Sequence, residues 1–453
     1  MLKHVLFLFL FAWISDIHAQ TENLFDYPTE DMIVAEDSSI NCDQDSTGLI
    51  PLTDMGNTYY NGVQGGLYKS GTNILMGPHK KKGVTISKNM KPLDTLGNID
   101  YMSGEILFLG LGASVASNLF NAYVDSVKDS DYAGMSECVS VKGMFTAGKD
   151  LDDMIDTIYP AFWTTLKGRM QDKDDTYAQV QVLWILQQSD SDSSDDFTTY
   201  YNSVMGKYIT LMQILKDSFP NLKQVYLSGI HYTGYMYPEH KRYSAYSEPK
   251  GYWSNLVIKD LIQKQITGDP ALAFEGPAIK SAWIAWGPYF WADGKNPRAY
   301  DGLNWLCDQY RTDSTGAGFH LLDSSYGFGI EAAMVKTFME THPVSYIWYK
   351  DGPLWVDCGV DTTRMSKYET VQENIRIFPN PASAEFTILL PELISGQIII
   401  TIYNEMGVPV YRKLYENYIA PGVDIDLKFS DGIYFAEVIC ASNKYSAKFT
   451  ISD

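Results

Sequence analysis

The stretch Glu105-Ile106-Leu107-Phe108-Leu109-Gly110-Leu111-Gly112-Ala113-Ser114 decides the fold of this chain. A continuous apolar run that ends in small residues is typical of a strand buried on both faces of a parallel sheet. Apolar residues at helical spacing follow it, namely Leu119, Phe120, Tyr123 and Val127. The segment therefore predicts a buried strand that leads directly into a helix.

Apolar runs of the same kind recur at 138–141, 180–186, 224–228 and 282–286. Helical patterns accompany them, the clearest at 208–219 and 330–339. Strands that alternate with helices predict an α/β fold, here a three-layer, doubly wound parallel sheet of the flavodoxin-like type. Ligands bind such sheets at the carboxyl ends of the strands, so functional residues are expected there.

Residues 375–453 have a different pattern. Short apolar runs with polar residues interspersed occur at 386–390, 398–403, 433–438 and 447–451, and glycine-containing turns separate them. Short strands at this spacing predict a small antiparallel β-sandwich.

This C-terminal region resembles the type A sorting domain of the type IX secretion system of Bacteroidota. The resemblance is carried, in chain order, by Pro379-Asn380-Pro381, Tyr403-Asn404-Glu405-Met406-Gly407, Asp431-Gly432-Ile433-Tyr434 and the closing segment 445–451. It implies that residues 375–453 bind the type IX secretion machinery, which delivers the chain to the outer-membrane surface or the medium. An ordinary binding sandwich is the alternative.

The N-terminus agrees with export. Lys3 precedes an apolar run over 5–14, and Ala19 stands at a cleavage position, so residues 1–19 are expected to be a secretory signal peptide. The run is too short for the ~20 residues that span a bilayer, and no later segment is longer, so no transmembrane segment is expected in the mature chain.

Three further regions follow from these boundaries. Residues 20–100 are rich in Gly, Asn, Asp, Tyr and Thr and are expected to form an irregular arm on the main domain. Residues 101–350 form the predicted α/β domain, and 351–374 the linker to the sorting domain.

The formal net charge of −20 argues against nucleic acids and anionic membranes as partners. The acidic run 190–196 is expected to be a solvated loop; a calcium site there is the alternative, although the run lacks a recognised calcium-loop spacing. Five cysteines leave at least one thiol unpaired, and the sequence does not decide the pairing. No metal or cofactor motif is present, so neither is expected.

Two residue types at the predicted ligand edge point to nucleophilic chemistry. Ser114 follows the first buried strand, where its hydroxyl and the backbone N–H groups of the next helix would be exposed. His320 closes the segment Gly316-Ala317-Gly318-Phe319-His320 before the last helix and could act as its base. His231 lies after another strand, on the ligand edge of the predicted sheet, and is a further candidate for which a structural role is favoured.

Residues 58–350 also resemble a largely uncharacterised group of secreted bacterial proteins related to SGNH hydrolases. The matching pieces include Gln64-Gly65-Gly66-Leu67-Tyr68, 106–114, 178–184, 219–228, Trp286-Gly287-Pro288-Tyr289-Phe290-Trp291-Ala292-Asp293-Gly294 and 301–307. The resemblance implies that Ser114 is the nucleophile equivalent and His320 the catalytic histidine equivalent, with no cofactor.

The departures from that group are equally informative. The Asp usual three residues before the histidine is Ala317, and further polar positions of the group hold Val115, Leu186, Ile230 and Trp253. Loss of an orienting Asp lowers turnover by roughly 10⁴ in a characterised triad.

Other residues are candidates for the missing roles. Asp313 and Asp323 lie near the histidine in sequence and could orient it. Gly143, Gly148 and Gln187 are candidate oxyanion residues beside the Ser114 N–H.

Three functions stay open at this point. The first is an exported serine esterase of low or altered activity. The second is an inactive scaffold that binds ligands such as glycans on exposed tryptophans, and the third is a structural surface protein. The candidate stacking residues are Trp253, Trp283, Trp286, Trp291 and Trp305, and a core position is the alternative for each of them.

Overall fold

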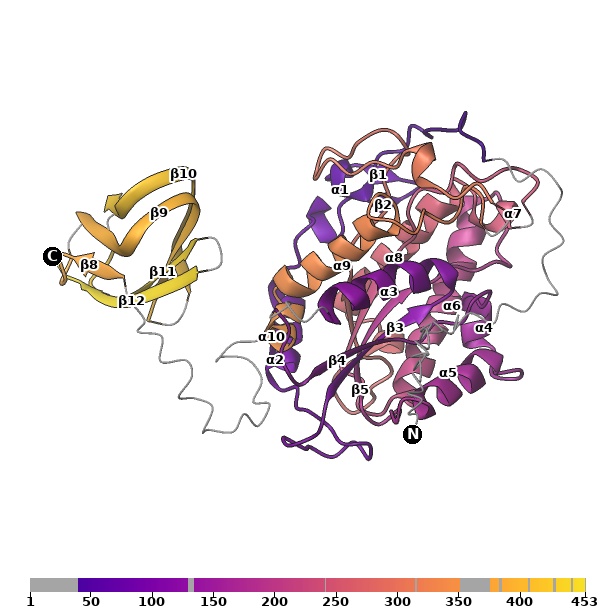
Figure 1. Cartoon of the computed structure of the whole chain (residues 1–453), viewed down its shortest axis with the longest axis horizontal. Coiled ribbons are helices and arrows are strands. Elements are labelled where there is room, and N and C mark those ends of the chain that lie inside the picture. The colour runs from indigo at the N-terminus through magenta and orange to yellow at the C-terminus, as the bar shows by residue number, and fades with distance from the viewer. Residues whose placement is uncertain are drawn as a thin grey trace, which may run out of the picture. The chain divides into compact units, whose positions relative to one another are not determined.

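The computed structural model describes residues 40–128, 134–240, 242–313, 316–350, 375–382, 385–405, 408–426, 429–440 and 443–452. The chain divides into two compact units, residues 1–359 and 360–453 (Figure 1). The expected signal peptide and linker lie outside the described residues.

The first unit is built on a five-stranded parallel sheet. Its strand order is β4 (Val139–Gly143), β3 (Ile106–Gly112), β5 (Val180–Leu186), β6 (Gln224–Ser228) and β7 (Trp283–Trp286). The predicted α/β class and parallel sheet are therefore confirmed. The strand order is that of the flavodoxin-like sheets, in which the chain first steps to one side and then returns across its starting strand.

Helices cover both faces of this sheet (Figure 1). α3 (Ser114–Lys128) and α9 (Phe328–Thr341) pack together on one face, and α6 (Phe197–Ser218) and α8 (Lys250–Ile266) pack together on the other. Right-handed crossovers require this division, because the step from β3 to β4 runs opposite to the later steps. Every residue of β3, β5, β6 and β7 is buried as a result.

Shorter elements complete the unit. They are α1 (Leu52–Met55), β1 (Tyr59–Tyr60), β2 (Val63–Gln64), η1 (Lys69–Gly71), α2 (Gly77–Lys88), α4 (Leu151–Ile155), α5 (Ala161–Gln171), α7 (Tyr243–Tyr246), η2 (Pro270–Leu272), η3 (Cys307–Gln309) and α10 (Ser345–Tyr349). Among the described residues, no helix combines the length and the apolar character needed to cross a membrane.

The five candidate stacking tryptophans lie in the core, which agrees with the core alternative and not with a stacking surface. Trp253 is 5% exposed, and the other four are at most 1% exposed. Their indole N–H groups find internal acceptors, as in the bonds from Trp286 to the Leu67 carbonyl and from Trp305 to the Phe290 carbonyl, both 2.8 Å. A buried indole needs such an acceptor, and these aromatics therefore stabilise the interior instead of presenting a binding face.

The N-terminal arm is less irregular than expected, because it contains the helix α2. Pro78 stands in the first turn, where its missing N–H costs nothing. The helix packs closely on β7, since a Cβ at Gly83 would lie 2.5 Å from the Trp283 ring. Its lysines and glycines leave only weak apolar periodicity, which explains why the sequence pattern does not reveal it.

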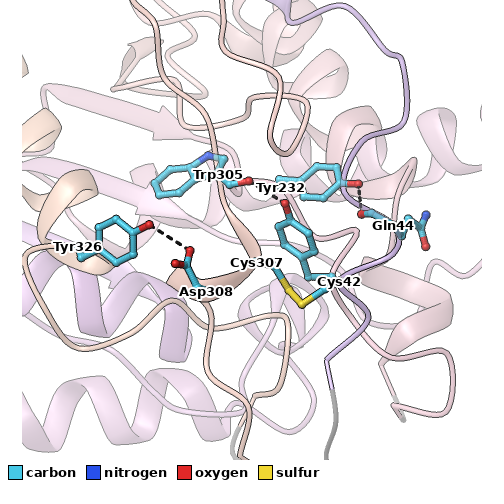
Figure 2. Close-up of a disulfide and its surroundings, with 8 residues drawn as sticks. Cys42, Gln44, Tyr232, Trp305, Cys307, Asp308 and Tyr326 are labelled. Carbon is cyan, nitrogen blue, oxygen red and sulfur yellow. Dashed lines mark hydrogen bonds between the residues drawn. A yellow bond between two sulfur atoms is a disulfide. The ribbon is translucent and has the colours of Figure 1, made fainter.

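A disulfide fastens the start of the described chain to the main domain. Cys42 is bonded to Cys307 with a Cα–Cα distance of 5.5 Å (Figure 2). Beside it the Tyr232 hydroxyl donates to the Gln44 carbonyl at 2.7 Å. Cys138 is also disulfide-bonded. Disulfides suit an exported protein, because they persist in oxidising compartments.

The second unit is an antiparallel sheet, in agreement with the predicted all-β class. Its strands are β8 (Arg376–Phe378), β9 (Glu385–Asn404), β10 (Pro409–Asp426), β11 (Gly432–Cys440) and β12 (Asn443–Ile451). They pair in the order β10-β9-β11-β12, and β8 pairs with β9. Alternate residues of β9, such as Ile398, Ile400 and Ile402, are fully buried in a separate core, as the period of a strand requires.

One histidine whose ring nitrogens are buried makes the stability of the first unit depend on pH. His342 stacks on Phe338 at 4.5 Å, and neither ring nitrogen has a hydrogen-bond partner. Burial lowers its pKa to about 3. The unfolded chain therefore binds a proton that the folded chain refuses, and stability falls as pH drops below the ordinary histidine pKa.

We expect His342→Phe to remove this loss of stability at low pH. The stability of the variant relative to wild type should rise by roughly 3 kcal/mol between pH 7 and pH 4. Urea unfolding followed by tryptophan fluorescence measures this unit alone, because every tryptophan precedes residue 356. A difference that stays constant with pH would contradict the buried neutral histidine.

Candidate active site

Ser114 and His320 meet at the carboxyl edge of the sheet. The Ser114 Oγ lies 2.8 Å from the His320 Nε2, although the residues are 206 positions apart. Ser114 follows β3, the strand at which the strand order reverses between β4 and β5. Such a reversal is where open α/β sheets form their ligand crevice. The structure thus brings the two predicted residues into hydrogen-bond contact.

Gly112 allows the strand to turn into the helix at this point. It has a φ of +151°, and a Cβ there would lie 2.4 Å from the Leu186 carbonyl oxygen and 2.6 Å from the Ala116 Cβ. Only glycine fits so close to a neighbouring backbone. Ser114 consequently becomes the first residue of the 15-residue helix α3.

The first helical turn supplies a positive electrostatic environment. The first hydrogen bond of the helix runs from the Ser117 N–H to the Ala113 carbonyl, so the N–H groups of Ser114, Val115 and Ala116 precede the intrahelical ladder. The partial positive charge of a helix N-terminus favours negative charge developing beside it.

Hydrogen bonds of its own backbone hold His320 in place. Its N–H donates to the Gly316 carbonyl and its carbonyl accepts from the Arg311 N–H, both at 2.8 Å. The imidazole lies against Gly316, where a Cβ would come within 2.2 Å of Nδ1. A glycine is therefore required at this position for the ring to reach Ser114.

A second, fully buried histidine holds the same turn. The His231 Nε2 lies 2.9 Å from the Phe319 carbonyl oxygen, and its Nδ1 lies 2.9 Å from the Glu331 Oε1. A carbonyl can only accept, so Nε2 carries a hydrogen. The Nδ1–Oε1 contact then contains one further proton, and the pair is neutral in total whether that proton is on the imidazole or on the carboxyl group.

Sequence reasoning found His231 at this edge but missed Glu331. The carboxyl group belongs to the first turn of α9, where the helix dipole favours it. A Glu within an apolar helical pattern ordinarily faces solvent, so only the fold reveals its partner.

One of the two expected histidine-orienting acids, Asp323, binds other groups. The Asp323 carboxylate binds Arg311 and the Asn118 amide, the latter at 3.3 Å, and is not bonded to His320. That expectation is corrected, because a nearby guanidinium binds the carboxylate instead. Asp313 is exposed in the turn before His320, and its carbonyl accepts the Gly316 N–H at 3.4 Å. Ala317 is buried.

The three expected oxyanion residues also serve other purposes. Gly143 pairs with Gly110 within the sheet, and the exposed Gly148 is a loop residue; neither lines the cavity beside Ser114. Gln187 does line it, but its Nε2 donates to the Lys149 carbonyl at 3.0 Å and contacts the Met154 sulfur at 3.4 Å. Its amide therefore holds the loop after β4, which leaves the first turn of α3 as the nearest set of donors.

The cavity beside Ser114 is small. Its volume is about 20 Å³, which is room for about one water molecule. The side chains that close it were not found from the sequence, and they are Gln188, Arg242, Tyr246 and Phe319. Tyr246 and Phe319 stack face to face at 5.1 Å, and the Gln188 Oε1 is a buried acceptor without a hydrogen-bond partner.

The acidic run 190–196 is a largely exposed loop, as expected, and ion pairs hold part of it. Lys207 binds both Asp152 and Asp192 at 2.5 Å. Oxygens of Asp150, Asp152 and Asp190 lie within 4.8 Å of one another. Burial, together with the hydrogen bond to Asp190, raises the pKa of Asp150 to about 8. An ammonium group and a proton thus neutralise part of this cluster.

Comparison with known families identifies the C-terminal unit. Residues 376–452 match the secretion system C-terminal sorting domain. This match supports export of the chain as a type IX secretion cargo, with contact to the secretion machinery and a destination at the cell surface or in the medium. No curated protein matches the chain significantly.

Solved structures add only distant likenesses. A Cellulomonas fimi endo-β-1,4-mannanase double mutant is 12% identical with a TM-score of 0.14, over 61% of this chain and 48% of that one. The chain thus spans about half the length of that mannanase. A Bacteroides uniformis β-glucuronidase 2 calcium-binding mutant is 8% identical with a TM-score of 0.19, over 83% of this chain and 43% of that one. At these scores neither enzyme informs the fold or the function of this chain.

The buried pair behind His320 gives a stability prediction. Glu331→Gln should keep a hydrogen bond to a neutral His231, because the amide can donate to Nδ1. Glu331→Leu leaves Nδ1 buried without a partner, and we expect it to be less stable than the Gln variant by about 1–3 kcal/mol. Urea unfolding followed by tryptophan fluorescence compares the two. Equal stability would show that the contact contributes nothing.

Proposed function

We propose that the first unit is an exported ester hydrolase in which Ser114 is the nucleophile and His320 the general base. The observation that carries the proposal is the 2.8 Å contact between Oγ and Nε2 at the N-terminus of α3. A nucleophile and base at hydrogen-bond distance, beside preorganised N–H donors, is the arrangement that acyl transfer requires. The resemblance to SGNH hydrolases supports the same assignment.

The reaction would proceed in two steps, acylation of Ser114 and hydrolysis of the acyl-enzyme. The Ser114 Oγ attacks the ester carbonyl carbon while its proton moves to the His320 Nε2. The carbonyl oxygen becomes an oxyanion near the N–H groups of the first α3 turn. Collapse of this intermediate breaks the bond to the alcohol, which takes the proton from His320. Water then repeats the sequence and releases the acid from Ser114.

The surrounding contacts would assist His320 without an acid three residues earlier. His231, itself bonded to Glu331, holds the Phe319 carbonyl, and Gly316 lies against the His320 imidazole. An imidazole ring held in one orientation loses less entropy on approach to the transition state than a ring that is free to rotate. Turnover below that of a complete triad is expected, since Ala317 provides no carboxylate.

An inactive binding protein is the second candidate. The cavity beside Ser114 has a volume of about 20 Å³, which is too little for an acyl group. Substrate entry would therefore require the Tyr246–Phe319 wall to move. If that wall stays closed, the pair is a structural hydrogen bond.

Labelling with a fluorophosphonate probe distinguishes these candidates. We expect the mature protein to be labelled, Ser114→Ala to be unlabelled, and His320→Ala to be labelled roughly 10³-fold more slowly. Mass spectrometry of the labelled peptide locates the adduct. Ser126→Ala is the matched control, because this exposed serine lies on the same helix far from the cavity, and it should label as wild type does.

The opposite result is equally clear. A folded wild type that is not labelled would reject the hydrolase and favour the binding protein. Labelling that persists in Ser114→Ala would assign the reactivity to another serine.

A further inference from the structure

Arg242 stands at the cavity of Ser114 without an acidic partner. It precedes α7 and lines the same cavity as Ser114 and Val115. Its Nη2 donates to the Gly148 carbonyl at 3.3 Å, and its guanidinium carbon lies 5.7 Å from the centre of the Tyr246 ring. Within the described parts of the chain, no carboxylate pairs with this guanidinium. A guanidinium has five N–H donors, so one long contact to a carbonyl leaves most of them available.

The chain has a net charge of −20, yet Arg242 has no acidic partner among the described residues. Two other arginines of the unit do have one, since Arg298 pairs with Asp301 and Arg311 with Asp323. The carboxylates of the nearby loops have partners of their own. Asp152 binds Lys207, and Asp150 accepts the backbone N–H groups of α4. A guanidinium that stays unpaired beside a candidate nucleophile is therefore available to a ligand.

A chain of ring contacts connects Arg242 to the catalytic histidine. Arg242 lies over Tyr246, Tyr246 stacks on Phe319 with an interplanar angle of 9°, and Phe319 lies 5.3 Å from the His320 ring. The same aromatic stack thus lines the cavity and contacts both groups. A ligand group bound by Arg242 would lie against this stack, close to Ser114.

We propose that Arg242 is the specificity-determining residue of this site and binds a carboxylate on the substrate. The substrate class is then an ester with an anionic group near the scissile bond. A guanidinium binds a carboxylate through two parallel N–H···O bonds, which also orient it. The carboxylate would replace the single contact to Gly148. This inference rests on the proposed function for its reaction, and on Arg242 alone for its selectivity.

A matched pair of small esters tests the selectivity. 4-Acetoxybenzoate and 4-acetoxybenzamide have the same scissile acetate and nearly the same shape, and only the first carries a carboxylate. We expect wild type to have the higher kcat/KM for the benzoate. Arg242→Gln should lower the benzoate-to-benzamide ratio of kcat/KM by roughly 10- to 100-fold, the range of a charge-assisted hydrogen bond. The ratio for Arg242→Lys should lie between those of wild type and Arg242→Gln, because lysine keeps the charge but loses the two-point geometry.

Arg169→Gln is the control for net charge. Arg169 is exposed on α5, it likewise has no acidic partner among the described residues, and it does not line the cavity. This variant should keep the wild-type ratio. An Arg242→Gln ratio equal to that of wild type would overturn the proposal.

A binding measurement separates this inference from the proposed hydrolysis. Calorimetry in the Ser114→Ala background should show 4-acetoxybenzoate binding that the additional Arg242→Gln change weakens at least 10-fold. If wild type hydrolyses neither ester and resists the fluorophosphonate, the hydrolase fails, yet this binding difference would still support the anion subsite. Equal binding by the two proteins would reject the subsite, whatever the catalytic result.

Discussion

The pairing of β3 with both β4 and β5 is the constraint on which the candidate site depends. A parallel strand between two neighbours leaves its sheet only at its carboxyl end, and Gly112 lets the chain turn there at once into α3. The nucleophile candidate, the helix N-terminus and the residues after β5 consequently converge on one point. Neighbouring connections diverge on opposite faces of the sheet at such a reversal, which creates the crevice.

A series of buried hydrogen bonds among residues far from Ser114 in the sequence positions His320. Glu331 holds His231, His231 holds the Phe319 carbonyl, and the next residue is His320. Because these groups are buried, each bond is costly to leave unmade, and the chain has few alternative conformations. The orientation that an Asp gives in a complete Ser–His–Asp triad could thus be supplied here through the backbone.

The small cavity beside Ser114 and the polar groups around it belong to one arrangement. Tyr246 and Phe319 form an aromatic wall, Arg242 lies at its outer edge, and Gln188 offers a buried acceptor inside. An aromatic stack can be displaced as a unit, whereas the sheet and α3 behind Ser114 cannot move without disrupting the core. The segment before α8 thus supplies one aromatic side of the cavity, Tyr246, and the charge that would select the ligand, Arg242.

The sequence by itself determined the class of the fold and the sorting domain. Local patterns suffice for these two features, because an apolar run such as 105–112, a glycine turn and repeated short strands each act within a few residues. The pairing of Ser114 with His320 was instead predicted from the resemblance to SGNH hydrolases. The helix α2 escaped detection because its burial depends on Gly83 and His79 facing Trp283, a contact between segments about 200 positions apart.

Only the tertiary structure decided which polar groups face one another. In the folded chain Asp323 pairs with Arg311, the Gln187 amide bonds to the loop after β4, and Glu331 bonds to His231. The tertiary structure also buried the tryptophans and brought Arg242 to Ser114. Hydrogen bonds and ion pairs require atoms within about 3 Å of one another. Side chains far apart in sequence reach that distance only when the sheet and its helices have packed.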